Sequence, residues 1–331
     1  MDSLLKEKAD LMVENFYQLK KGFKWETSIV KHFGAMVHAT KGKQIDIEAL
    51  KEINKHIKSN TGLTSYFRGT NLFILSSLLS LEGDYKGFFK NILSVYEQMR
   101  SEGFKNSTYL PLAAYAIAKE IPMDQWSNRI LRMNDLYKNM KKNHFWLTSP
   151  DDYVFAAVLA TTDLDLLQMD SEIEKCYKLL NQEGFHKGND LQSLSHILAI
   201  GEELNIDKCK RAMKLYLGLK SEKCKLQYNG LATLGVLTLI NQDIDKIVNE
   251  VKQVYDYIKE QDGYGFWSLD TSMRSILAAN LVADFYVAGI KKGVLEVALG
   301  NSINVIIIAQ QQAMIAAACA ASASAAASSG S

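Results

Sequence analysis

The chain has 331 residues, and its 38 Lys and Arg residues nearly balance its 37 Asp and Glu residues, giving a net charge of +1. This balance excludes the strongly basic surface that a nucleic-acid-binding protein presents. Hydrophobic residues make up 47% of the chain and charged residues 23%, which excludes disorder over most of its length.

The first residues, MDSLLKEKADLMVENF, carry charges throughout and lack the unbroken apolar core of roughly 7–15 residues that a signal peptide needs. We therefore expect a cytoplasmic protein. Glutamines at 310–312 interrupt the apolar run near the other terminus, so we expect no membrane span and no membrane partner. The cysteines form no C-x-x-C pair, and we expect buried free thiols. They are Cys176, Cys209, Cys224 and Cys319.

A tyrosine recurs about every 40 residues, each time inside a similar helical segment. Five such segments, from VYEQMRSEGF to VYDYIKEQDGY, have their tyrosines 39 to 41 residues apart, and three of them reach a glycine followed by an aromatic residue. Two weaker copies lie upstream, so the sequence contains seven units of one repeat. The tyrosines are Tyr96, Tyr137, Tyr177, Tyr216 and Tyr255, and the weaker copies contain Tyr17 and Asn54.

Each unit predicts two helices of different character. The first has apolar residues at helical spacing among Lys and Glu, which is typical of an amphipathic helix, and a glycine ends it. The second is almost free of charge, which is typical of a helix covered on all sides. We predict amphipathic outer helices near residues 2–21, 46–60, 85–101, 122–142, 170–183, 206–220 and 243–261. We predict apolar inner helices near residues 25–40, 69–82, 107–120, 151–164, 190–204, 228–241 and 270–289.

The sequence therefore predicts an all-α fold built from helical hairpins of about 40 residues. We favour an α/α toroid, because closing the ring covers the inner helices without polar end repeats. The alternative is an open, HEAT-like α-solenoid with capped ends. We predict a single helical-repeat domain over 1–289, an additional C-terminal helix over 290–318 and a low-complexity Ala/Ser tail over 319–331.

The segment QDGYGFWSLDTS, residues 261–272, resembles the Q-x-D-G-G-F-G-x-W turns of α/α-toroid proteins, namely prenyltransferase β subunits and triterpene cyclases. The catalytic motifs of toroid enzymes are not matched, because the chain has neither a D-x-D-D acid nor a Cys-His pair. The repeated units and the segment AQQQAMIAA, residues 309–317, resemble an uncharacterised bacterial family of about this size that is known only as a domain of unknown function. This resemblance implies a cytosolic protein of Gram-positive bacteria and supplies no activity.

Polar residues gather where the inner helices are expected to begin, at one end of the ring. Free backbone N–H groups there favour acceptors, so these residues are N-caps or line a polar rim over an apolar cavity. Aromatic residues follow several of the turns, where they either wedge neighbouring repeats or form a collar suited to a sugar, peptide or isoprenoid. The polar candidates are Asp151, Asp152, His186, Asn189, Asp190, Asn229 and Asp270, and the aromatic ones are Trp25, Tyr66, Trp146 and Trp267.

Arg274 stands about one turn into an almost uncharged inner helix. Because a buried arginine usually has a carboxylate partner, we expect either an i,i+4 pair with Asp270 or an anion-binding group that faces the cavity. Asp152, Asp190 and Asp270 are candidates for an acid/base pair across the mouth. The sequence has no H-E-x-x-H, P-loop, G-x-G-x-x-G or G-x-S-x-G motif, so we expect no metal and no cofactor.

Three hypotheses for the function follow. The favoured one is a non-catalytic helical toroid that binds a small molecule or peptide in its central cavity. The second is an α/α-toroid enzyme acting on a glycan or isoprenoid, and the third is a protein-interaction scaffold. The sequence does not indicate the oligomeric state.

Overall fold

The computed structural model describes residues 1–201, 203–227, 230–240 and 242–290. This part of the chain contains fourteen α-helices, two short 3₁₀ helices and no strand, which confirms the predicted all-α class. Every predicted outer and inner helix is present, and most of the inner helices are shorter than expected. The C-terminal helix and Ala/Ser tail expected beyond residue 290, Cys319 among them, lie outside the described residues, as does the candidate Asn229.

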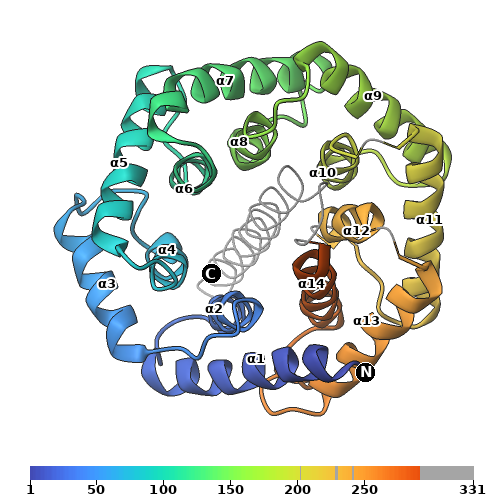
Figure 1. The fold of residues 1–331 in the computed structure, drawn as a ribbon, viewed down its shortest axis with the longest axis horizontal. Coiled ribbons are helices and arrows are strands. Elements are labelled where there is room, and N and C mark those ends of the chain that lie inside the picture. Colours follow the sequence, from blue (N-terminus) through green and yellow to red (C-terminus); the bar gives the residue numbers. More distant parts are fainter. Residues whose placement is uncertain (202, 228–229, 241, 291–331) are drawn as a thin grey trace, which may run out of the picture.

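The helices form two concentric rings, and each outer helix leads into an inner one (Figure 1). The outer ring consists of α1 (Ser3–Gly22), α3 (Ile47–Ser59), α5 (Tyr85–Ser101), α7 (Trp126–Asn143), α9 (Leu166–Gln182), α11 (Asn205–Ser221) and α13 (Ile244–Lys259). The inner ring consists of α2 (Ser28–Thr40), α4 (Thr70–Leu79), α6 (Leu110–Glu120), α8 (Tyr153–Ala160), α10 (Asn189–Leu198), α12 (Gly230–Leu239) and α14 (Thr271–Ile290).

Helix α3 shows why the outer helices form. Its N-cap, Asp46, accepts the backbone N–H of Glu48 at 2.9 Å and so satisfies one of the donors that a helix start leaves free. The buried residues Leu50, Ile53 and Ile57 are spaced by three and four positions and therefore share one face. That face packs on the inner ring, and the charged residues face outward.

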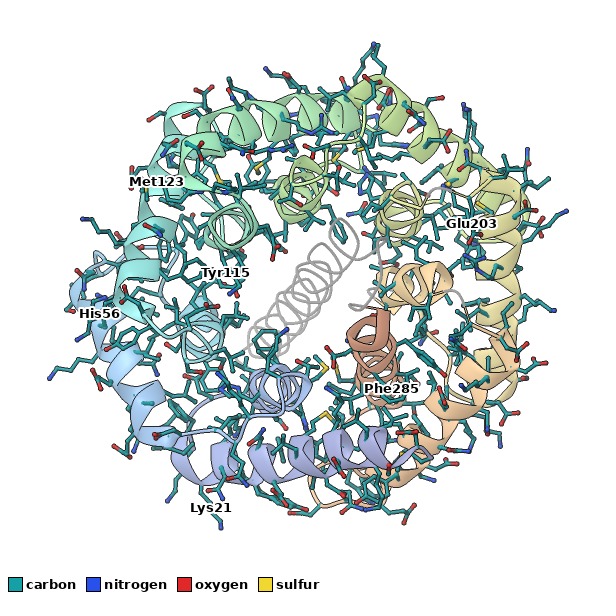
Figure 2. The ribbon with its side chains drawn as sticks, viewed as in Figure 1. Lys21, His56, Tyr115, Met123, Glu203 and Phe285 are labelled. Atoms are coloured by element: carbon teal, nitrogen blue, oxygen red, sulfur yellow. The ribbon has the colours of Figure 1, made fainter. Side chains whose placement is uncertain are left out.

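The inner helices are buried over most of their length, including polar side chains that α10 carries. All eight residues of α8 are buried, and Tyr115 of α6 is buried as well. Side chains fill the layer between the two rings (Figure 2). The two inner neighbours and the outer ring cover three sides of such a helix, and its fourth side faces the centre of the ring (Figure 1).

The inner helices run parallel, so all of them begin at the same end of the ring. Near the starts of α4 and α6, the Asn71 amide donates to the Thr108 carbonyl at 2.7 Å, and near the ends of α2 and α4 the His38 ring hydrogen-bonds the Ser80 hydroxyl at 2.9 Å. We call the end where the inner helices begin the aromatic end. Its loops are residues 23–27, 60–69, 102–109, 144–152, 183–188, 222–227 and 260–270.

We call the other end the acidic end, because aspartates cap the outer helices that begin there. These N-caps are Asp2, Asp46, Asp84, Asp165 and Asp243. Long basic side chains bind the carbonyl groups at which the inner helices finish. Lys8 donates to the Thr40 carbonyl at 2.9 Å, and Lys208 donates to the Gly201 carbonyl at 2.8 Å. These bonds satisfy carbonyls that helix geometry leaves free and place positive charge at the negative helix poles.

Helix α1 covers the last inner helix and closes the ring. It contacts both α13 and α14, and α14 also contacts α2 (Figure 1). The Tyr264 hydroxyl donates to the Met12 carbonyl at 3.2 Å, and Lys8 forms an ion pair with Asp284 at 2.9 Å. These contacts join residues 252 and 276 positions apart in the sequence.

Replacing Asp284 with Ala should cost about 3 kcal/mol of unfolding free energy, because it leaves the Lys8 ammonium buried without its carboxylate. The side chains of this pair are only 11% and 7% exposed. Lys20→Ala is the matched control, since it breaks the exposed pair with Asp262 at the same seam and should cost less than about 1 kcal/mol. Urea unfolding followed by circular dichroism measures both values. Equal losses would contradict a special role for the buried pair.

Gly263→Ala should destabilise the seam more than Gly103→Ala does. Both glycines have left-handed φ angles, +80° and +95°, so each substitution carries a backbone cost of about 1 kcal/mol. At Gly263 the added Cβ would also lie 2.2 Å from a ring carbon of Phe16, whereas at Gly103 nothing lies within 4 Å. The extra overlap should add roughly 1–3 kcal/mol in urea unfolding. A Gly263→Ala variant as stable as Gly103→Ala would show that the loop does not press on α1.

Candidate functional site

Three tryptophans at the aromatic end stand almost entirely in solvent. Trp25 is 100% exposed, Trp146 is 92% exposed and Trp267 is 94% exposed. The fourth tryptophan, Trp126 of α7, is 3% exposed, and its indole N–H donates to the Ile121 carbonyl at 2.9 Å. The first three therefore do not wedge neighbouring repeats, and their exposure agrees with an aromatic collar.

Other exposed apolar side chains extend this collar. Phe145 and Phe266 precede Trp146 and Trp267 and contact them edge-on, with ring centroids 5.3 and 5.2 Å apart. Leu63 is exposed in the second loop. The sequence analysis did not single out these three residues, although the Phe-Trp pair repeated in two units was a usable signal. Tyr66, a predicted candidate, is exposed to a smaller degree.

Buried Arg274 holds the last aromatic loop in place. Its guanidinium donates to the carbonyls of Tyr264 and Leu269, both at 2.7 Å, and to the Tyr255 hydroxyl at 2.8 Å. The two carbonyls bracket the segment that carries Phe266 and Trp267. Arg274 therefore acts as a positioning residue for these aromatic side chains.

The carboxylate pair expected for Arg274 is replaced by these neutral acceptors. The Asp270 carboxylate instead caps α14 by accepting the Met273 backbone N–H at 2.9 Å. The guanidinium is also only 1% exposed, so it does not face a cavity as an open anion site. The expectation overlooked the loop carbonyls, which satisfy a buried guanidinium through hydrogen bonds.

A pocket of about 540 Å³ opens beside Trp146, between the loops at 144–152 and 183–188. His144 lines it, with Nε2 2.7 Å from a Glu174 carboxylate oxygen and its ring 4.5 Å from the ring of Tyr177. The Tyr177 hydroxyl accepts the Gly188 backbone N–H at 3.2 Å. One of the repeat tyrosines thus fixes the wall of the pocket.

Polar side chains of α9 and the following loop complete this pocket. The Asn181 amide donates to the Phe185 carbonyl at 2.8 Å and so shapes the loop after α9. Lys178, Gln182 and Lys187 also line the pocket and carry hydrogen-bond donors. The pocket therefore combines aromatic faces with both donors and acceptors.

Asp152 lies buried at the start of α8. Its carboxylate accepts the Ser149 backbone N–H at 3.0 Å as part of a capping box. Burial, with a smaller effect from the neighbouring charge of Asp151, raises the pKa of Asp152 to about 7. Ser149 is the N-cap here, and Asp152 is the N3 acid of its capping box rather than the expected N-cap; its carboxyl titrates near neutrality.

The other polar candidates are more open. His186 and Asn189 are exposed, and Asp190 is half-buried, with burial raising its pKa. Asp151 accepts a hydrogen bond from the Ser149 hydroxyl. These residues lie along the loops of the aromatic end without joining the pocket beside Trp146.

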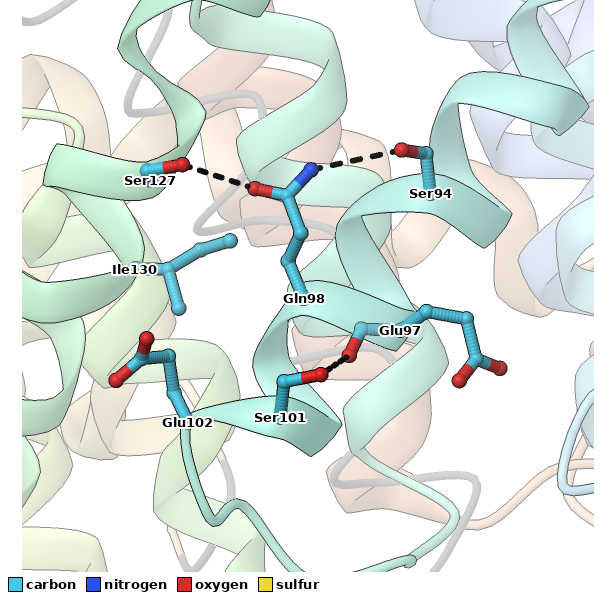
Figure 3. Close-up of a pocket in the computed structure, with 7 residues that line it drawn as sticks. All are labelled: Ser94, Glu97, Gln98, Ser101, Glu102, Ser127 and Ile130. Carbon is cyan, nitrogen blue, oxygen red and sulfur yellow. Dashed lines mark hydrogen bonds between the residues drawn. The ribbon is translucent and has the colours of Figure 1, made fainter.

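A second hollow, of about 300 Å³, lies in the outer ring between α5 and α7 (Figure 3). The Ser127 hydroxyl donates to the Gln98 side-chain oxygen at 3.2 Å, and the Gln98 amide donates to the Ser94 hydroxyl at 3.5 Å. Its polar groups thus bind one another, and no aromatic residue is among the described residues that line it. The pocket beside Trp146 is the stronger candidate.

Within residues 1–201, 203–227, 230–240 and 242–290, no group of three or more His, Cys, Asp or Glu side chains is placed to hold a metal ion. No helix in this part of the chain is both long enough and apolar enough to cross a membrane. Cys176, Cys209 and Cys224 are buried free thiols, as predicted.

Asp152→Asn should gain stability over the wild type as the pH rises. The folded pKa of about 7 exceeds the unfolded value of about 3.9, so the wild type loses stability from about pH 4 to about pH 7. Asparagine keeps an acceptor for the Ser149 N–H and does not ionise. Urea unfolding should show the variant gaining roughly 2–3 kcal/mol on the wild type between about pH 5 and about pH 8. A difference that stays constant with pH would contradict a raised Asp152 pKa.

Comparisons with known proteins identify relatives over most of the length. Residues 15–312 match a family described as protein of unknown function (DUF4003). The uncharacterized protein YeaA of Bacillus subtilis (strain 168) is 27% identical over 252 residues, which are 74% of this chain and 76% of YeaA. No solved structure matches. The resemblance to an uncharacterised bacterial family is thus confirmed, and the chain belongs to the DUF4003 family.

Proposed function

We propose that this protein is a non-catalytic binding protein that holds a small molecule or short peptide at the aromatic end of its ring. The observation that carries the proposal is the exposed Phe145–Trp146 pair beside a pocket of about 540 Å³. Exposed apolar side chains that touch one another, as Phe145 and Trp146 do, mark an interaction site more often than single exposed residues do. We place the site in this pocket rather than at the centre of the ring.

The size and chemistry of the pocket support a small ligand. Its volume lies within the roughly 300–1,000 Å³ that is usual for ligand sites. Phe145 and Trp146, which line the pocket, offer exposed faces on which an apolar or aromatic group can stack. Glu174, Gln182 and Lys187 offer acceptors and donors that would orient a polar group at the other end of the ligand.

The lining of the pocket supports binding rather than nucleophilic catalysis. His144 and Glu174 hydrogen-bond each other at 2.7 Å, but no Ser, Thr or Cys is among the described residues that line the pocket beside them. Asp152 serves a capping box. We also propose that the protein works in the cytoplasm, because its three described cysteines are free thiols, as is usual in a reducing compartment.

Saturation-transfer NMR with the full-length protein tests the proposal, using maltotriose and the peptide Gly-Trp-Gly as probes. We expect at least one probe to bind, and Trp146→Ala to weaken that binding roughly tenfold, because it removes the stacking face. The matched control is Trp25→Ala, an equally exposed tryptophan in a loop far from the pocket, which should leave binding unchanged. The proposal fails if neither probe binds, or if both variants bind like the wild type.

A further inference from the structure

Exposed apolar side chains lie in four of the seven loops of the aromatic end rather than at one site. Trp25 lies in the first loop, Leu63 in the second, Trp146 in the fourth and Trp267 in the seventh. Helices α7 and α8 lie across the ring from α1 and α2, so Trp146 is on the opposite side from Trp25 (Figure 1). A small ligand beside Trp146 cannot cover Trp25 as well. A partner that covers all of them must be broad.

Basic residues accompany these apolar side chains. The outer helices finish at the aromatic end, and six of the seven carry Lys or Arg in their last turn. These residues are Lys20, Lys21, Lys58, Arg100, Lys141, Lys142, Lys220 and Lys259. All but Arg100, which is half-buried, are exposed. The loops of this end also carry exposed acids, such as Glu102, Glu183 and Glu260, but exposed basic residues outnumber them. The opposite end carries the aspartate N-caps of five outer helices.

This pairing of exposed indole rings with lysines matches the chemistry of a lipid surface. Tryptophan prefers the headgroup region of a bilayer, where its ring is shielded and its N–H stays hydrated. Lysines near the surface are attracted to anionic lipids. The exposed indole rings, all of which lie at the aromatic end, are what orients the ring toward the lipid.

We propose that the aromatic end docks on the surface of a bilayer that contains anionic lipid. The loop aromatics enter the headgroup layer, and the lysines at the ends of the outer helices contact lipid phosphates. No spanning helix is needed, so the sequence-based expectation of no membrane partner, which rested on the lack of a span, is revised here. A second copy of the chain fits this face less well, because a face-to-face dimer would set lysines against lysines.

Sedimentation with vesicles tests this docking, using the full-length protein. We expect binding to vesicles of phosphatidylglycerol and phosphatidylcholine in equal parts, and much weaker binding to phosphatidylcholine alone. Added salt should weaken the binding, because it screens the lysines. Trp25→Ala combined with Trp267→Ala should lower the partition coefficient roughly tenfold or more, since two apolar side chains no longer insert.

The matched control is Leu167→Ala combined with Leu204→Ala. These leucines are also strongly exposed, 79% and 72%, but lie at the acidic end. This control should bind vesicles like the wild type, and circular dichroism shows whether both double variants are folded. Quenching of tryptophan emission by brominated phosphatidylcholine, mixed with phosphatidylglycerol, should be strong for the wild type and gives a readout independent of the variants.

Three results would overturn the proposal. One is that the wild type binds neither vesicle, and another is that the acidic-end control loses binding as much as the tryptophan variant. The third is lipid-independent self-association that the tryptophan variant abolishes, which would assign the face to a second copy. The proposal goes beyond the ligand pocket and fails separately from it, because Trp25 and Trp267 lie outside that pocket and Glu174→Ala should leave vesicle binding intact.

Discussion

Seven inner helices that are buried over most of their surface have to be covered, and this constraint organises the molecule. Each inner helix is shielded by its neighbours and by the outer ring, and the last one is shielded in part by α1, which returns to it. The buried Lys8–Asp284 pair and the Tyr264 hydrogen bond to Met12 fasten that return. An open stack would leave one side of α2 and one side of α14 in water, at a large hydrophobic cost.

Closure also separates the roles of the two ends. At the acidic end, basic side chains such as Lys8 and Lys208 bind the carbonyls of the inner helices, and aspartates cap the outer helices. At the aromatic end, a buried aromatic side chain anchors the last loop, and the aromatic side chains that follow it are exposed. The buried one is Tyr264, and the exposed ones are Phe266 and Trp267. Exposed aromatic side chains thus gather at the aromatic end, whereas the exposed apolar side chains of the acidic end, such as Leu167 and Leu204, are aliphatic.

The sequence predicted the helices well, because each repeat carries its own helical pattern and most repeats carry a glycine after the outer helix. It could not predict contacts between residues far apart in the chain, such as Lys8 with Asp284, because nothing local marks them. It also misjudged Arg274, since the local pattern offered Asp270 as a partner and hid the loop carbonyls that bind the guanidinium. Whether a tryptophan packs between neighbouring repeats or points into solvent depends on the path of the loop backbone, and the repeat pattern does not determine that path.

The central claim is that the tryptophans of the aromatic end are unpacked and free to meet a partner. Acrylamide quenching of four single-tryptophan variants, with Phe at the other three positions, tests it most directly. We predict that Trp25, Trp146 and Trp267 are quenched almost as fast as free tryptophan, whereas Trp126 is protected. Protection of the first three to the same degree as Trp126 would mean that they wedge the repeats, and the aromatic end would lose its role as a binding surface.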